Sequence, residues 1–194
     1  MAMGGRRRRG TLPAEPFTPT REELRAELAG DLSRGGYVLR GGDGPSGDRR
    51  YFDKFLVLCR PGLLTRAARL LAGIVSDECE RLAVTGVPST ALATALAQET
   101  GLALLLADDT HPGRFGGDFS AGTRVALVED VVFTGGTALA GTRALRAAGA
   151  EPLDVVCLLD RQSGGAQLLA GDGVGLRALF TETDLLAQPG QPPR

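Results

Sequence analysis

The sequence predicts an α/β protein with a doubly wound, mainly parallel central sheet flanked by helices, and a small hood at its N-terminus. Segments that are apolar throughout alternate with segments of helical period, and such strands are typical of a parallel sheet that is covered on both faces. The chain has 194 residues, of which 43% are hydrophobic, so it suits one domain with a sizeable core.

The N-terminal end is predicted to be a disordered tail over residues 1–17, because it is rich in Gly, Arg and Pro and has no apolar period. The arginine run at 6–9 is typical of a solvated tail or an expression remnant, although it would also suit contact with a phosphate polymer. A single domain is expected over 18–194, with the hood at 18–60 and the core at 61–187.

The hood is predicted to begin with a helix. Thr20 and Glu23 form a capping box before leucines spaced by four residues, and the helix is expected to end at Gly35 and Gly36. Residues 37–58 then predict two short strands joined by a glycine-rich loop.

The core is predicted to alternate strands and helices, and it contains no internal repeat. A polar loop rich in Gly, Asp and Pro is expected at 108–122, and the segment 175–186 closes the pattern. Strands are expected at 81–88, 102–107, 123–130 and 152–161, and helices at 62–79, 89–101 and 137–150.

The bulk composition argues against several classes of partner. The net charge is −1, so no global field draws the chain to nucleic acid or membranes. No apolar run approaches the roughly 18 residues of a membrane span, and no apolar segment follows the basic N-terminus as in a secretory signal. Cys59, Cys79 and Cys157 match neither a disulfide framework nor zinc spacing, so we expect reduced thiols in a cytoplasmic protein. Lys54 is the only lysine.

The most informative stretch is VALVEDVVFTGGTALAG, at 125–141, where a buried strand ends in Glu129 and Asp130. Ligands of open α/β sheets bind beyond the carboxyl ends of strands. The following turn leads into a helix near Thr137, whose backbone N–H groups and dipole favour an anion. The carboxylates suit vicinal hydroxyls or Mg²⁺. The carboxylates and the helix N-terminus together predict a binding site for ribose 5-phosphate. The alternative is a helix capped by Thr, with acidic residues that are exposed by chance.

This stretch resembles the phosphoribosyl pyrophosphate (PRPP) signature of the type I phosphoribosyltransferases. The resemblance implies that Glu129 and Asp130 hold the ribose hydroxyls and a magnesium ion and stabilise an oxocarbenium-like ribose. It is not a Walker A loop, because no Gly-Lys-Ser/Thr follows. The residues implied to hold the 5-phosphate are Val132, Phe133, Thr134, Gly135, Gly136 and Thr137.

Further segments, over about residues 20–187, are similar to the orotate branch of that family. GDRRYFDKF resembles the region whose backbone binds the pyrimidine, which places Tyr51 and Phe52 there; the alternative is a pair of core aromatics on a strand. LLDRQSGG resembles the family's strand that ends in Asp-Arg, which implies that Arg161 binds the orotate carboxylate. The planar guanidinium of an arginine suits a carboxylate. The alternative is that Arg161 is a surface arginine at the end of a strand. VTGVPSTALATALA places Ser89 and Thr90 at the pyrophosphate.

Two segments depart from the family pattern. In the family, the second strand usually ends in Arg-Lys. It leads into a mobile loop that carries a lysine and a His-Gly and reaches the partner subunit's site. This chain instead has Ala107, Asp108 and Asp109 at the end of the strand, and its loop has no lysine. His111 and Arg114 are the basic residues left in the loop, and we take them as catalytic candidates; His111 would otherwise be a solvated residue. The aspartates would bind magnesium or cap a turn. The pyrophosphate loop, VPSTA, has no basic residue.

The resemblance implies transfer of a phosphoribosyl group from PRPP to orotate, giving orotidine 5-phosphate and pyrophosphate in pyrimidine biosynthesis. The expected form is a cytoplasmic, magnesium-dependent homodimer without nucleic-acid or membrane partners. Two alternatives stay open because the loop lysines are missing. One is a transferase for another carboxylated base, and the other is a non-catalytic PRPP-binding homologue or partner subunit.

Overall fold

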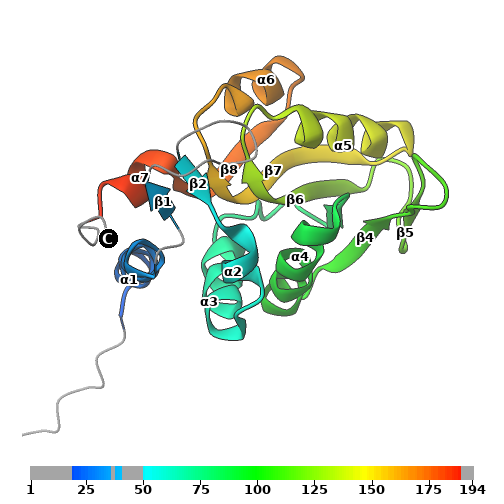
Figure 1. The fold of residues 1–194 in the computed structure, drawn as a ribbon. Helices are drawn as coiled ribbons and strands as arrows, with labels where there is room; N and C mark the ends of the chain where they lie inside the picture. Colours follow the sequence, from blue (N-terminus) through cyan, green and yellow to red (C-terminus); the bar gives the residue numbers. More distant parts are fainter. Residues whose placement is uncertain (1–18, 36–37, 41–49, 189–194) are drawn as a thin grey trace, which may run out of the picture.

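The computed structural model describes residues 19–35, 38–40 and 50–188 (Figure 1). The tail expected at 1–17 lies outside these described residues, as does most of the glycine-rich loop expected in the hood.

A six-stranded sheet forms the centre of the molecule, in the order β5-β4-β3-β6-β7-β8. Its strands are parallel except for the edge strand β5, which pairs antiparallel with β4. The mainly parallel sheet is therefore confirmed. The strands are β3 (Arg81–Val84), β4 (Ala103–Ala107), β5 (Phe115–Gly116), β6 (Arg124–Val132), β7 (Glu151–Asp160) and β8 (Gly175–Thr181).

Helices cover both faces of the sheet. Figure 1 shows α5 (Gly136–Ala147) and α6 (Gly165–Gly171) on one face, and α2 (Lys54–Leu58), α3 (Pro61–Ala72) and α4 (Val87–Thr100) on the other. In β6, Leu127 packs in the core on the α5 side, whereas Val128 packs in the core on the α3 side. Successive side chains of a strand point to opposite faces. A strand covered on both faces therefore has to be apolar at each covered position, as β6 is from Val125 to Val128.

The hood packs onto the face that α3 and α4 cover. It contains α1 (Arg21–Arg34) and a two-stranded sheet, in which β1 (Val38–Arg40) pairs antiparallel with β2 (Arg50–Phe52). The predicted capping box is confirmed, since the hydroxyl of Thr20 accepts from the N–H of Glu23 at 3.2 Å and the Glu23 carboxylate accepts from the Thr20 N–H at 2.7 Å. The C-terminal helix α7 (Glu182–Leu186) contacts α1 through an ion pair from Arg25 to Asp184 at 2.6 Å.

Several sequence-based assignments need correction, among them the strand expected at 81–88, which ends at Val84 before α4 begins at Val87. The apolar run after Asp53 was predicted as part of a strand, but it forms α2, because the Asp53 carboxylate caps the N–H of Leu56 at 3.2 Å. The following helix ends at Ala72, before Gly73, rather than continuing to residue 79. The edge strand β5 and the short helix α6 were not predicted. None of the described helices has the length and apolar character that a membrane span requires.

Candidate functional site

Two adjacent carboxylates lie at the carboxyl end of β6, as predicted. Glu129 is 6% exposed and Asp130 is 3% exposed. Neighbouring side chains on a strand diverge, so Glu129 lines a pocket beside α5, whereas Asp130 faces Lys54 of α2. The two acids therefore have different surroundings at the end of the sheet, Glu129 bordering the pocket and Asp130 pairing with Lys54.

Ser89 connects the two acids. Its hydroxyl donates to Oε2 of Glu129 at 3.0 Å and accepts from the backbone N–H of Asp130 at 3.2 Å. The side chain is 2% exposed and lies in the first turn of α4. Its predicted contact with pyrophosphate stays a prediction; in the structure the Ser89 hydroxyl holds the Glu129 carboxylate and the backbone of Asp130. The hydroxyl of Thr90 donates to the carbonyl of Gly86 at 3.1 Å.

Lys54 forms an ion pair with one member of the acid pair, Asp130. Its Nζ lies 2.9 Å from Oδ2 of Asp130, in an ion pair that is not aligned as a hydrogen bond. The other oxygen, Oδ1, accepts from the N–H of Val131 at 2.6 Å. The sequence offered one signal for this role, since Lys54 is the single lysine of the chain, but nothing in the sequence placed it beside Asp130.

Glu129 has an unusual environment for a carboxylate. Burial raises the pKa of this side chain above its ordinary value. The negative charge of Asp130 adds to this rise, whereas the hydrogen bond from Ser89 and the positive charge of Lys54 oppose it. Its Oε1 is buried and has no hydrogen-bond partner. A buried acceptor without a donor is costly, so this oxygen suits a hydroxyl or a metal ion brought by a ligand.

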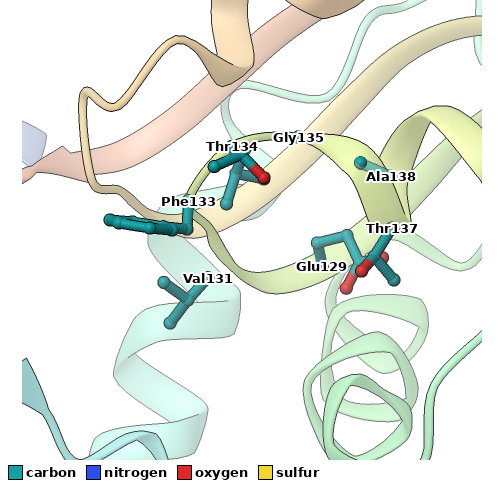
Figure 2. Close-up of a pocket in the computed structure, with 9 residues that line it drawn as sticks. Glu129, Val131, Phe133, Thr134, Gly135, Thr137 and Ala138 are labelled. Atoms are coloured by element: carbon teal, nitrogen blue, oxygen red, sulfur yellow. The ribbon is translucent and has the colours of Figure 1, made fainter. Parts of the chain in front are cut away.

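The pocket beside Glu129 is built from the turn between β6 and α5 (Figure 2). It encloses about 110 Å³. Gly135 is the N-cap of α5 at φ +81°, and no side chain caps the helix. The first N–H groups of a helix have no partner within it, so they are available to an anion in the pocket. The lining residues are Glu129, Val131, Val132, Phe133, Thr134, Gly135, Gly136, Thr137 and Ala138.

The two glycines of this turn differ in their surroundings. A Cβ on Gly135 would lie 2.9 Å from Cα of Gly165, in the backbone at the start of α6. A Cβ on Gly136 would meet nothing closer than the hydroxyl of Thr134, at 4.0 Å. Gly135 is therefore required by the fold, whereas the space over Gly136 is left for a ligand.

Arg161 lies next to this turn. Its Nε donates to Oε2 of Glu182 at 3.0 Å, both side chains being 12% exposed, and its guanidinium lies 5.3 Å from the centre of the Phe133 ring. Its own N–H donates to the carbonyl of Val132 at 2.8 Å. The structure therefore brings the predicted acceptor-binding arginine together with the predicted phosphate-binding loop.

The remaining predicted residues lie apart from the pocket or inside the core. Phe52 is 5% exposed and packs in the hydrophobic core, as the core-aromatic alternative expected. For Tyr51 the structure describes the backbone pairing with Leu39. His111 and Arg114 are exposed and do not belong to the residues that line the pocket.

The loop after β4 is a tight turn in the structure. The Asp108 carboxylate accepts from the N–H of Thr110 at 2.9 Å and lies 3.0 Å from Nδ1 of His111. The hydrogen bonds from Thr110 hold the pKa of Asp108 below its usual value, even though this side chain is solvated. Asp108 therefore caps a turn, one of the two roles that the sequence left open.

Comparison with known proteins identifies relatives along most of the chain. No protein-family model matches it. It is 36% identical over 173 residues to the orotate phosphoribosyltransferase of Nocardioides sp., covering 84% of this chain and 94% of that protein. It is also 36% identical over 161 residues to the orotate phosphoribosyltransferase of Methanoculleus marisnigri, covering 81% and 92%.

Solved structures agree in fold with the chain. The phosphoribosyltransferase of Corynebacterium diphtheriae superposes with a TM-score of 0.73 at 26% identity, covering 84% of this chain and 98% of that one. The orotate phosphoribosyltransferase of Mycobacterium tuberculosis in complex with PRPP superposes with a TM-score of 0.70 at 25% identity and the same coverage.

Proposed function

The chain belongs to the orotate phosphoribosyltransferase family, and on that premise we propose that it transfers the phosphoribosyl group of PRPP to orotate, releasing pyrophosphate and forming orotidine 5-phosphate for pyrimidine biosynthesis. The observation that carries the proposal is Glu129, which lines a pocket formed by the uncapped N-terminus of α5 and whose buried Oε1 has no hydrogen-bond partner. One pocket thus offers a hydroxyl acceptor and an anion site together.

The donor is proposed to bind across this pocket. Its 5-phosphate would accept hydrogen bonds from the first N–H groups of α5 and from the hydroxyls of Thr134 and Thr137, which are exposed. Its ribose hydroxyls would donate to Glu129 and Asp130. As the bond to pyrophosphate lengthens, positive charge develops on the ribose, and the two fixed carboxylates stabilise that charge.

The acid pair also suits a magnesium ion. Proteins usually hold Mg²⁺ through one or two carboxylates together with substrate phosphates, and Glu129 presents a buried oxygen without a donor. Glu129 and Asp130 would hold the ion with the donor, and it would supply positive charge to the leaving pyrophosphate.

The acceptor is proposed to bind beside Arg161. Its guanidinium is fixed by Glu182 and by the ring of Phe133, so it meets a planar carboxylate without further ordering. Orotate has such a carboxylate, and its attacking nitrogen would then face the ribose held by the acid pair. Tyr51 and Phe52 are proposed to contribute backbone groups to the same site.

The proposed setting is a homodimer in the cytoplasm. Cys59, Cys79 and Cys157 are free thiols in the described part of the chain, which suits a reducing compartment. In a dimer, the loop with His111 and Arg114 would approach the pyrophosphate of the partner's site. Sedimentation of the purified chain measures this assembly.

The function is tested by turnover of orotate and PRPP with MgCl₂, in wild type and in Asp130→Asn. Orotidine 5-phosphate is measured by mass spectrometry, and reactions without PRPP are the control. We expect product from wild type and a loss of at least about a hundredfold in Asp130→Asn, since charge stabilisation of this kind is worth about 10²–10³ in rate.

Pyrophosphate release with other carboxylated bases, but none with orotate, would overturn the assignment of the acceptor. PRPP binding without any turnover by wild type would favour the non-catalytic alternative. The aspartates at 108 and 109, which stand in place of a basic pair, would agree with that outcome.

A further inference from the structure

Among the residues that the structure describes, Asp130 forms an ion pair with one cation. Its side chain is 4% exposed and lies directly beside the buried Glu129. A buried carboxylate is costly unless it is paired, and Lys54 is the described residue that forms an ion pair with Asp130. Glu129 and Asp130 are thus two adjacent buried acids, and the Lys54 ammonium pairs with Asp130.

The position of Lys54 is set by the core. It is the first residue of α2, whose N-cap Asp53 holds the N–H of Leu56. Val57 is 0% exposed and Leu58 is 5% exposed, so they anchor the short helix in the core. The lysine backbone is therefore fixed at the side of the acid pair.

The contacts on Asp130 fix the plane of its carboxylate. Oδ1 accepts from the N–H of Val131 at 2.6 Å, and Oδ2 faces the Lys54 ammonium at 2.9 Å. The Lys54 side chain is 29% exposed, so the ammonium is still partly hydrated. Oδ2 is buried and is not committed to an aligned hydrogen bond, so it keeps the capacity to accept one from a sugar hydroxyl that reaches it while the ion pair persists.

We propose that Lys54 is a positioning residue for the donor: its ammonium holds the Asp130 carboxylate in the orientation that the ribose hydroxyls of PRPP require. This inference rests on the proposed function, and it assigns to the single lysine a role in the sugar subsite. The donor's affinity then depends on the Lys54–Asp130 pair.

The test is a double-mutant cycle on binding of PRPP with MgCl₂, measured by calorimetry without acceptor. The proteins are wild type, Lys54→Met, Asp130→Asn and the double variant. Met matches the length of the lysine stem without its charge. We expect Lys54→Met to weaken binding about tenfold, within the coupling found for contacting charged residues, and to have no further effect in the Asp130→Asn background.

Two controls separate positioning from general stabilisation. Lys54→Arg keeps the charge and is expected to regain part of the affinity. Arg69→Met removes an arginine that pairs with Glu99 at 3.4 Å on the protein surface, and it is expected to bind PRPP like wild type.

Other outcomes would overturn the inference. Undiminished binding by Lys54→Met would mean that the lysine stabilises the fold alone. Equal losses in both backgrounds would mean that Lys54 contacts the donor directly and does not act through Asp130. A wild-type protein that binds no PRPP would overturn the proposed function, and this inference with it.

Discussion

Ser89 donates a hydrogen bond of 3.0 Å to Glu129, and this contact joins the first turn of α4 to the end of β6. The same hydroxyl accepts from the N–H of Asp130. One buried oxygen therefore contacts the carboxylate of Glu129 and the backbone of Asp130, although it comes from a segment forty residues earlier in the chain.

Ser89→Ala is expected to lower both stability and donor affinity. It leaves Oε2 of Glu129 and the N–H of Asp130 without their partner, which costs about 1–3 kcal/mol for a buried group. Urea unfolding measures the loss. Thr94→Ala is the matched control, because its hydroxyl bonds the carbonyl of Thr90 at 2.8 Å on the exposed side of the same helix. Equal stability of the two variants would contradict the role of Ser89.

Two glycine variants separate the fold of the loop from its binding. Gly135→Ala is expected to lose about 1–3 kcal/mol of stability, because the new Cβ would combine a positive φ with a 2.9 Å approach to the backbone of Gly165. Gly136→Ala is expected to keep wild-type stability, because a Cβ there meets no atom closer than 4.0 Å. It is expected to lose PRPP affinity, since the methyl group would occupy the phosphate's space.

Thermal unfolding and calorimetric titration with PRPP measure the two effects. The phosphate assignment would be wrong if Gly136→Ala bound PRPP as tightly as wild type.

The Arg161–Glu182 pair predicts an effect on the acceptor. Arg161→Lys keeps the charge but loses the planar fork and the stack on Phe133. We expect the KM for orotate to rise about tenfold, the value of one good charged contact, with the KM for PRPP unchanged. Steady-state kinetics measure both. Arg177→Lys is the control, since Arg177 pairs with Asp154 at 2.7 Å near the start of β8. A rise in both KM values would instead indicate a general disturbance of the site.

The sheet and the donor loop were predictable because their signals are local. The central residues of β6 and β7 are apolar on both faces, and the acids near the end of β6 and the glycines after it lie in one continuous stretch. The short helix α2 was not predictable, because its apolar run is too brief to show a helical period and its Asp53 cap also suits a turn. The Lys54–Asp130 pair depends on how α2 packs, which no local pattern records.

Protonation of Glu129 predicts how stability depends on pH. Its pKa in the folded protein is raised above 4.5, mainly by burial, so the folded state binds the proton more tightly than the unfolded state. Stability from this group is thus present below pH 4.5 and is lost as pH rises through the folded pKa. Glu129→Gln removes this loss and keeps an acceptor for Ser89.

Urea unfolding of wild type and Glu129→Gln, from pH 4 to pH 8, measures the effect. We expect the variant to gain stability relative to wild type as pH rises. A difference that does not change with pH would show that Glu129 titrates alike in both states.

The turn after β4 carries the last prediction. His111 and Arg114 are exposed, so His111→Ala and Arg114→Ala are expected to leave stability unchanged. If they stabilise the leaving pyrophosphate, each loss lowers kcat by about tenfold or more, while PRPP affinity changes little. Arg143→Ala is the control, since Arg143 pairs with Asp172 at 2.8 Å beside α6. Wild-type kcat in both loop variants would leave this segment as a capped turn without catalytic function.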